Sequence, residues 1–115
     1  MRLLGFAIED LAKSYLEENG LTLISQNFHS RFGEIDLIMQ HQQTLCFIEV
    51  RHRKTTTYGS AAESITPSKQ QKIRKTALFF LQKNNQYNGL NMRFDAMLSQ
   101  GKQKEVNFEW IKNAF

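Results

Sequence analysis

The sequence has little of what builds disulfides, zinc sites or other cysteine chemistry. Its 115 residues include one cysteine, so an internal disulfide is excluded and a reducing compartment is favoured. Cys46 lies in an apolar stretch and is predicted to be core rather than a nucleophile. The three histidines, His29, His41 and His52, lack the i, i+4 spacing of a zinc helix, and no Cys/His cluster stands near them.

Long apolar runs are also missing. No stretch approaches the roughly 20 apolar residues that cross a bilayer, and the amino terminus lacks the order of a secretory signal. We therefore expect a soluble, cytoplasmic protein with no membrane partner. A chain of 115 residues with 41% hydrophobic content fits one domain, residues 1–115, with a modest core.

Positive charge is in mild excess and unevenly spread. Fifteen Lys and Arg oppose eleven acids, giving a net charge of +4 and a basic bias that suits a polyanionic partner. Residues 51–75 contain one acid, Glu63, and seven cations: Arg51, Arg53, Lys54, Lys69, Lys72, Arg74 and Lys75. A phosphate backbone is expected to be drawn there, with Arg51, Arg53, Lys54, Lys69 and Lys72 as its contacts.

Hydrophobic periodicity predicts a helix, three strands, a second helix and two further strands. The first helix covers about 3–18 and ends at Asn19-Gly20. The second begins at Pro67, with Thr66 as its N-cap, and ends near Asn84. The first strand begins at 21–24, and residues 26–33 are a loop or the end of that strand. The other four strands are predicted at 34–40, 44–52, 92–98 and 106–111. Residues 53–66 are predicted to be a surface loop.

The first helix carries an acid beside its apolar stripe. Leu4, Ile8, Leu11 and Tyr15 recur at helical spacing, and Glu9 lies near the edge of the stripe that they form. From that edge Glu9 is able to reach the sheet. The alternative is that Glu9, like other charges of this helix, is simply solvated.

Two acids stand inside runs that otherwise read as strand. Asp36 and Glu49 lie on either side of the turn-like stretch 41–44, so a hairpin would bring both carboxylates onto one patch of sheet. Strand alternation puts Glu34 on the face of Asp36, and Arg51 on the face of Glu49. Carboxylates among apolar residues cost free energy unless compensated, and a hard divalent cation with oxygen ligands compensates them.

The predicted order is that of an α/β or α+β fold, a mixed β-sheet flanked by helices in the order αβββαβ(β). Order and residues together resemble the PD-(D/E)XK nuclease superfamily, with its restriction-endonuclease-like core, and more closely the YraN-like family of predicted endonucleases, which is similar to archaeal Holliday junction resolvases. The resemblance covers nearly the whole chain and rests on Gly5 and Glu9, residues 33–38, 47–53, Tyr58-Gly59, 66–69, 93–95 and 113–115.

The resemblance implies a metal-dependent hydrolysis. Asp36 and Glu49 would hold Mg²⁺ or Mn²⁺, the carbonyl of Val50 would add a ligand, and Glu9 would help through water or a second ion. A divalent ion in such a site lowers the pKa of a bound water and neutralises charge on the phosphate. Glu34 is a further ligand on this interpretation, or else an exposed charge at the start of its strand.

One position departs from the superfamily pattern. Its motif lysine, two positions after the glutamate, is Arg51 here. Arginine stays protonated, so Arg51 cannot act as a general base, although it can bind phosphate and stabilise transition-state charge. Lys69 supplies the missing ammonium on one interpretation, and on another it is a solvated or backbone-phosphate contact.

Two other polar residues are predicted to be structural. Asp95, in the fourth strand, is expected to bond Arg93, a loop or a helix end rather than a metal. His52 should face away from Glu49 and make packing or hydrogen-bonding contacts.

The sequence thus predicts a Mg²⁺- or Mn²⁺-dependent endonuclease acting on DNA, in a branched or single-stranded form. Its catalytic residues would be Glu9, Asp36, Glu49, Arg51 and Lys69. The alternative is a noncatalytic nucleic-acid-binding or protein-interaction module that kept the nuclease fold, with Arg51 as the sign of lost chemistry. A homodimer with two sites would suit a branched substrate, since so small a domain has limited surface for gripping it.

Overall fold

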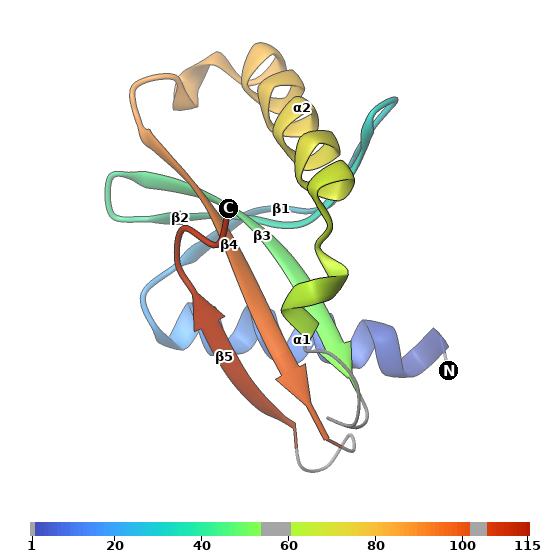
Figure 1. Ribbon diagram of the computed structural model, residues 1–115. Coiled ribbons are helices and arrows are strands. Elements are labelled where there is room, and N and C mark those ends of the chain that lie inside the picture. The colour runs from blue at the N-terminus through green and yellow to red at the C-terminus, as the bar shows by residue number, and fades with distance from the viewer. Residues whose placement is uncertain (1, 54–60, 102–105) are drawn as a thin grey trace.

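A computed structural model of the chain describes residues 2–53, 61–101 and 106–115 (Figure 1). Its elements follow the predicted order, with two short 3₁₀ helices added. Their bounds are α1 Arg2–Glu18, β1 Thr22–Ser30, β2 Gly33–His41, β3 Thr44–Arg53, η1 Ala61–Ser64, α2 Pro67–Lys83, η2 Asn85–Tyr87, β4 Asn91–Gln100 and β5 Asn107–Ile111. The expected loop 53–66 therefore contains η1, while Lys54, Tyr58 and Gly59 lie outside the described residues.

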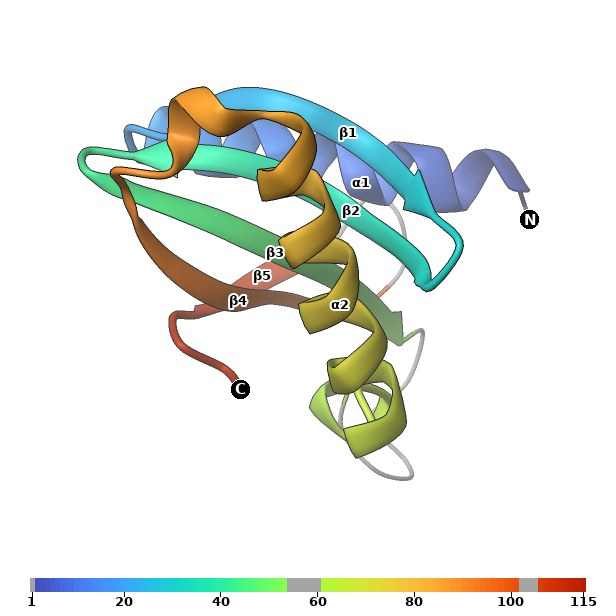
Figure 2. The same cartoon turned by 90° about the horizontal axis from the view of Figure 1, so that it is seen from above.

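The five strands form one mixed sheet between two helices. They lie side by side in the order β1-β2-β3-β4-β5, and every neighbouring pair is antiparallel except β3 and β4. Those two run parallel because the chain crosses over through α2 between them. Figures 1 and 2 show α1 on one face of the sheet and α2 on the other. The predicted α/β architecture and the antiparallel meander of the first three strands are confirmed.

Each helix covers its own hydrophobic cluster. On the α2 face, Ile38, Phe47 and Phe94 pack with Ile73 and Phe80 of the helix. The cluster on the α1 face is formed by Ile8, Ala12, Leu16, Leu21, Leu37, Met39, Cys46, Ile48, Val50 and Met97. β2 and β3 contribute to both clusters because their side chains alternate between the faces, so these central strands are apolar on both sides.

Cys46 is buried in the α1-side cluster, as predicted. Burial, and after it the charge of Asp95, raises the pKa of its thiol to about 11. A thiol with so high a pKa is almost entirely protonated at neutral pH, which confirms a core role rather than a nucleophilic one.

The buried stripe of α1 is rotated from the predicted one. Ile8, Ala12 and Leu16 are buried at a spacing of four, whereas Leu11, which we expected in the core, is 42% exposed. With about 100° of turn per residue, Glu9 then lies at the edge of the buried face, away from Leu11. The rotation turns the carboxylate of Glu9 toward the sheet.

β1 is longer than the sequence pattern indicates, and it is kinked. It continues to Ser30 through the stretch that we expected to be loop or strand end. Asn27 within it has a φ of 54°, and its neighbours pair across the hairpin as Gln26↔Leu37 and Phe28↔Ile35. Asn is one of the few residues that adopts this left-handed conformation readily, so it marks an irregularity beside Asp36.

The alternation of β2 changes opposite this irregularity. Ile35 packs in the α2-side cluster, while Leu37, two residues later, packs in the α1-side cluster. Residues two apart in a regular strand would face the same side. The change of face falls at Asp36, so regular strand alternation does not set the side of Asp36 in this part of β2.

The amino terminus of α2 has the predicted cap. The hydroxyl of Thr66 accepts a hydrogen bond from the backbone N–H of Lys69 at 3.3 Å, and Pro67 occupies the first turn. Thr76, a polar residue of α2, is fully buried. Its hydroxyl lies 3.0 Å from that of Ser30 and donates to the carbonyl of Lys72 at 2.8 Å. Through Thr76, α2 therefore holds the end of β1.

Asp95 is structural, as predicted, and it anchors the end of the chain. Its fully buried carboxylate accepts hydrogen bonds from Arg93 Nε at 2.9 Å and Trp110 Nε1 at 2.9 Å. The backbone N–H of Asn113 donates to the same carboxylate at 3.1 Å. A buried charge is tolerated when it is paired and hydrogen-bonded in this way. The network ties β5 and the residues after it to β4.

No helix among the described residues is long and apolar enough to cross a membrane.

The Asp95 network leads to a prediction on stability. Replacing Asp95 with alanine should leave the half-buried Arg93 without its partner, and breaking a pair with a buried member in this way typically costs about 3–5 kcal/mol. The free energy of unfolding, measured by urea denaturation followed by circular dichroism, should fall by that amount. Asp10→Ala, at an exposed position of α1, is the control and should change it by less than about 0.5 kcal/mol. Equal effects of the two substitutions would contradict the structural role of Asp95.

Candidate active site

The site lies where β2 and β3 part at the open end of their hairpin. The last paired residues are Leu37 and Ile48, so Asp36 and Glu49 are the next residue on each strand. The backbone N–H of Val50 donates a hydrogen bond to Asp36 Oδ2 at 2.8 Å, in place of a partner from the β2 backbone. Both carboxylates are buried, with residue exposures of 8% and 6%. The predicted convergence of Asp36 and Glu49 is thus present.

Arg51 is folded back onto its own strand. Its Nη2 lies 2.5 Å from Glu49 Oε2, and its Nη1 donates to the carbonyl of Val50 at 3.1 Å. The guanidinium therefore spans two of the oxygens that the family resemblance assigns to a metal. Residues two apart in a strand share a face, which explains why Arg51 reaches Glu49. The fork of parallel N–H groups suits such a two-point contact.

The other oxygen of Glu49 is left without a partner. Glu49 Oε1 is buried and accepts no hydrogen bond from the described part of the chain. An unsatisfied buried acceptor costs about 1–3 kcal/mol, or more when charged. Such an atom indicates a position at which another group binds.

The pKa of Glu49 reflects this surplus of negative charge. Burial first, and then the charge of Asp36, raise the pKa to about 8 from an ordinary value of 4.5, and a hydrogen bond that the protonated carboxyl makes with Asp36 adds to the rise. Arg51 and Lys69 act in the opposite direction but do not cancel the rise. Two carboxyls forced together out of water resist carrying two negative charges, so the pair favours a proton or a cation.

Glu9 extends the acidic group from the α1 side. Burial, followed by the charges of Asp36 and Glu34, raises its pKa, while hydrogen bonds with the side chains of Gln26 and Asn27 lower it. Its Oε1 is buried and accepts no hydrogen bond from the residues that the structure describes. Of the two interpretations of Glu9, the half-buried position beside Asp36 agrees with a site residue and not with a solvated charge.

Lys69 is near enough to lower the pKa of Glu49 through its charge. It is an exposed residue at the start of α2, on the face of the sheet opposite α1. The site is therefore approached by an acid from one helix and by a cation from the other. The five residues predicted to be catalytic come from four elements: Glu9 from α1, Asp36 from β2, Glu49 and Arg51 from β3, and Lys69 from α2.

The oxygen atoms of this arrangement are of the kind that binds a hard cation, but the protein offers only a few of them. Within residues 2–53, 61–101 and 106–115, no three His, Cys, Asp or Glu side chains gather closely enough to hold one ion. Direct protein ligands would therefore be Asp36, Glu49 and the carbonyl of Val50, with Glu9 acting through water. Mg²⁺ is commonly bound by one or two carboxylates, with waters and substrate phosphates completing the shell. The donor set fits that pattern, and Glu49 Oε1, which has no hydrogen-bond partner among the described residues, would be one of the ligand atoms.

The remaining predicted site residues lie at or beyond the edge of this group. Glu34 is exposed and sits 3.5 Å from His29, which agrees with its interpretation as a surface charge. His52 Nδ1 lies 2.9 Å from the hydroxyl of Ser99, the hydrogen-bonding role expected of it. Arg53 is the last residue of β3, and Lys72 is exposed on α2.

Sequence reasoning did not identify Gln26 and Asn27 as site residues. Their side chains lie close enough to Glu9 to lower its pKa by hydrogen bonding. Asn27 has a left-handed backbone and lies between the residues that pair with Leu37 and Ile35, on either side of Asp36. The available signal was an asparagine in a run of otherwise strand-forming residues, since Asn tolerates a left-handed backbone. That signal also suits a loop or the end of a strand, the two alternatives that the sequence leaves open for 26–33.

Fold and site together define a small α/β protein with a buried carboxylate pair at the open end of a hairpin. The pattern of the Uncharacterised protein family UPF0102 matches residues 8–98, and the chain belongs to this family. A UPF0102 protein of Saccharophagus degradans is 48% identical over 111 residues, covering 96% of this chain and 91% of its own length. A UPF0102 protein of Aliivibrio fischeri strain MJ11 is 46% identical, and the match covers 92% of this chain and 85% of its own length. One of Vibrio vulnificus strain YJ016 is 44% identical, and the match covers 98% of this chain and 92% of its own length.

The raised pKa of Glu49 predicts a pH dependence of stability in the metal-free protein. Because the folded state holds the proton more tightly than the unfolded state, this contribution is complete below about pH 4.5 and is lost as the pH rises to about 8. The free energy of unfolding should fall across that window by at most about 1.4 kcal/mol per pH unit. Urea denaturation at several pH values in EDTA measures it.

Glu49→Gln is the comparison, because the amide keeps the shape and cannot ionise. The difference in stability between the parent and Glu49→Gln should change with pH over the same window. A difference that stays constant would show that Glu49 titrates normally in the folded protein.

Proposed function

We propose that this protein is a metal-dependent endonuclease that hydrolyses phosphodiester bonds in DNA. The observation that carries the proposal is the buried pair Asp36 and Glu49, with one Glu49 oxygen unpartnered, at the point where the pairing of β2 and β3 ends. A buried carboxylate oxygen without a hydrogen-bond partner lowers the stability of the fold, so the presence of Glu49 at this position favours a functional role. The resemblance to the PD-(D/E)XK superfamily and its YraN-like family supports the same proposal.

A Mg²⁺ or Mn²⁺ ion would be held by Asp36, Glu49 and the Val50 carbonyl. When bound, such an ion supplies Lewis acidity to a phosphate oxygen and lowers the pKa of a coordinated water. Asp36 is preorganised for this role because the Val50 N–H fixes its carboxylate. Glu9, on the other side of Asp36, orients water at the edge of the site.

Arg51 neutralises Glu49 and is placed to bind phosphate. A guanidinium remains protonated at any physiological pH, so Arg51 does not abstract a proton. When a phosphate enters, its oxygens offer the same two-point contact that Glu49 Oε2 and the Val50 carbonyl provide now. Transfer of the guanidinium to the phosphate would release both oxygens and place positive charge where the transition state is most negative.

DNA is the substrate that the charge distribution favours. The helix α2 carries Lys69, Lys72, Arg74, Lys75 and Lys83 and no acid. Lys69 and Lys72 lead from the acidic pair along the helix surface, and they give a phosphate backbone successive contacts. We extend the proposal to branched or single-stranded DNA as the substrate. We also propose a homodimer, because two copies together would have enough surface to grip a branched substrate.

A second candidate is favoured by one observation. The guanidinium of Arg51 spans the Glu49 carboxylate and the Val50 carbonyl, as an internal cation in the place of a metal would. A protein that binds nucleic acid or a protein partner through this fold, and has lost hydrolysis, would have the same geometry. Metal affinity separates the two candidates.

The nuclease proposal predicts cleavage that depends on metal and on both acids. Purified protein should cut a DNA substrate in Mn²⁺ and lose this activity in EDTA. Asp36→Asn and Glu49→Gln should each lower the rate by roughly 100-fold or more, since they remove charge from the metal site. The asparagine retains an oxygen for the Val50 N–H, so the fold should be preserved. Gel assays on single-stranded, duplex and branched DNA measure the rates.

The control for this experiment is Glu17→Gln, at an exposed position of α1, which should cut like the parent. The double variant of Asp36 and Glu49 tests for contamination. Cutting at the parental rate by that double variant would reject the assignment.

The two candidates predict different responses of Arg51 variants to metal. If the protein is a nuclease, calorimetry should detect Mn²⁺ binding by the parent that is lost in Asp36→Asn. Arg51→Met should bind Mn²⁺ more tightly, because a competing cation is gone. Binding by Arg51→Met alone, with none by the parent, would favour the noncatalytic module instead. The cleavage rate of Arg51→Lys should also be compared with that of the parent. A much higher rate in this variant would mean that the arginine suppresses cleavage in the native protein.

A further inference from the structure

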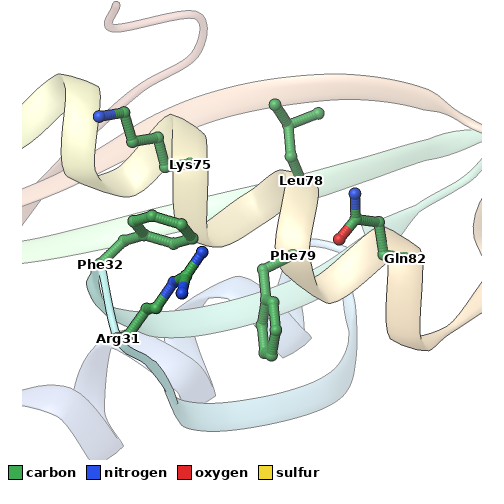
Figure 3. A pocket seen from close by; sticks show the side chains of 6 residues that line it. All are labelled: Arg31, Phe32, Lys75, Leu78, Phe79 and Gln82. Atoms are coloured by element: carbon green, nitrogen blue, oxygen red, sulfur yellow. The ribbon is translucent and has the colours of Figure 1, made fainter.

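A second surface of the molecule, apart from the carboxylate pair, has the features of a binding site. A cavity of about 380 Å³ opens between the β1–β2 turn and α2, lined by Arg31, Phe32, Lys75, Leu78, Phe79 and Gln82 (Figure 3). Its size is at the lower end of the roughly 300–1,000 Å³ typical of small-ligand sites. The rings of Phe32 and Phe79 stand on either side of the opening, and the guanidinium of Arg31 reaches between them.

Two of the apolar side chains here, Leu78 and Phe32, are not committed to the core, whereas the Phe79 ring lies 6.1 Å from that of Phe28. Leu78 is 57% exposed, and neither Leu78 nor Phe32 belongs to the two hydrophobic clusters under the helices. Phe28, four residues before Phe32, does pack in the α2-side cluster. The turn therefore places one aromatic ring inward and another at the surface. An apolar surface with a ring at each side leaves room for a flat apolar ligand.

The turn that carries Phe32 is held in place. The hydroxyl of Ser30 accepts from the backbone N–H of Phe32 at 3.0 Å and donates to the carbonyl of Gly33 at 3.2 Å. The same hydroxyl lies 3.0 Å from that of the fully buried Thr76 on α2. Gly33 has a φ of 152° and faces Lys72, so the turn lies close against the helix. A ring held by such contacts loses little conformational entropy when a ligand binds.

The charges around the cavity are positive. The guanidinium of Arg31 lies 4.9 Å from the centre of the Phe32 ring and the ammonium of Lys75 lies 5.9 Å from it. None of the six lining residues is an acid. The two cations rest on the ring as cation–π contacts, and a phosphate would attract them more strongly than the ring does. The site thus combines aromatic faces with cations that phosphates can recruit.

A row of lysines connects this cavity with the carboxylate pair. Lys69 is near Glu49, Lys72 lies against the turn at Gly33, and Lys75 lies over Phe32. Residues 69 and 75 are separated by about 9 Å along the helix axis, at 1.5 Å per residue. With about 3.4 Å per stacked nucleotide, that distance corresponds to roughly three nucleotides. One strand can therefore pass from the acidic pair to the cavity along α2.

We propose that the cavity between Phe32 and Phe79 binds an unpaired base of a nucleic-acid strand whose phosphates follow Lys69, Lys72 and Lys75. The inference rests on the proposed function and deepens it by naming a single-stranded segment as the substrate feature that this protein recognises. Base-on-ring stacking combined with a positive track is the usual means of binding single strands, whereas the bases of a duplex are already stacked on one another.

The test measures binding in EDTA, so that cleavage plays no part. The probes are a fluorescein-labelled oligothymidylate of about ten nucleotides and a labelled duplex of the same length, followed by fluorescence anisotropy. Phe32→Ala should weaken oligothymidylate binding by roughly 5- to 100-fold and duplex binding much less. Leu11→Ala, an exposed apolar position on α1 across the sheet, is the matched control and should bind both probes like the parent.

A second pair of variants tests stacking directly. Phe32→Trp should keep the affinity for oligothymidylate, and its added tryptophan emission should be quenched when the probe saturates. Leu11→Trp should show no such quenching. These variants also distinguish a lost stacking contact from a disturbed turn, because a tryptophan preserves the ring.

Several results would overturn the proposal. One is oligothymidylate binding by Phe32→Ala that is as tight as that of the parent. Another is an equal loss of single-strand and duplex binding in Phe32→Ala, and a third is the absence of quenching in Phe32→Trp. Displacement of the probe by polyglutamate with the same dependence on Phe32 would indicate an acidic peptide as the occupant. If oligothymidylate binding depends on Phe32 but the protein does not cut DNA in Mn²⁺, only the nuclease function is rejected. If the protein cuts DNA but its binding does not depend on Phe32, only the base-binding role of the cavity is rejected.

Discussion

The hydrogen bond from the Val50 N–H to the Asp36 carboxylate is the constraint on which the candidate site depends. It closes the β2–β3 hairpin with a side chain where the backbone pairing has ended, at 2.8 Å. Because one carboxylate oxygen is used in this way, Asp36 is fixed next to Glu49 on the adjoining strand. Because the Val50 N–H has this partner, β2 and β3 can separate here without leaving that N–H unpaired. Fold stability and site geometry are thus joined in one interaction.

The negative charges of Asp36, Glu49 and Glu9, which lie close together here, are only partly balanced by positive charge. Arg51 neutralises one oxygen of Glu49, while the other oxygen and one oxygen of Glu9 stay buried without hydrogen bonds from the described residues. The raised pKa values of Glu49 and Glu9 express the same imbalance, with burial as the largest cause of each. Perturbed acids in a cleft are typical of functional sites, although structural ion pairs also produce them. Here the acids are incompletely paired, which supports a site for a cation.

Helix α2 serves several purposes with different faces. Its buried face packs on the sheet through Ile73 and Phe80, and Thr76 holds the β1–β2 turn by way of Ser30. Its outer face carries lysines from the acidic pair to the surface at Phe32. A rigid helix keeps the distance between these two places constant. The proposed cleavage site and base-binding cavity are therefore positioned by the same element.

The sequence by itself determined the order of the elements, the mixed sheet between two helices, the cap at Thr66 and the candidate pair Asp36 and Glu49. Periodicity, capping and the rarity of acids in apolar strands are local properties, so they are visible in the chain. Tertiary structure alone decided which stripe of α1 is buried, and with it the position of Glu9, because the sheet selects the face that fits. It also decided that Arg51 turns back onto Glu49. Long-range packing and competition between charges set these features, and no local pattern encodes them.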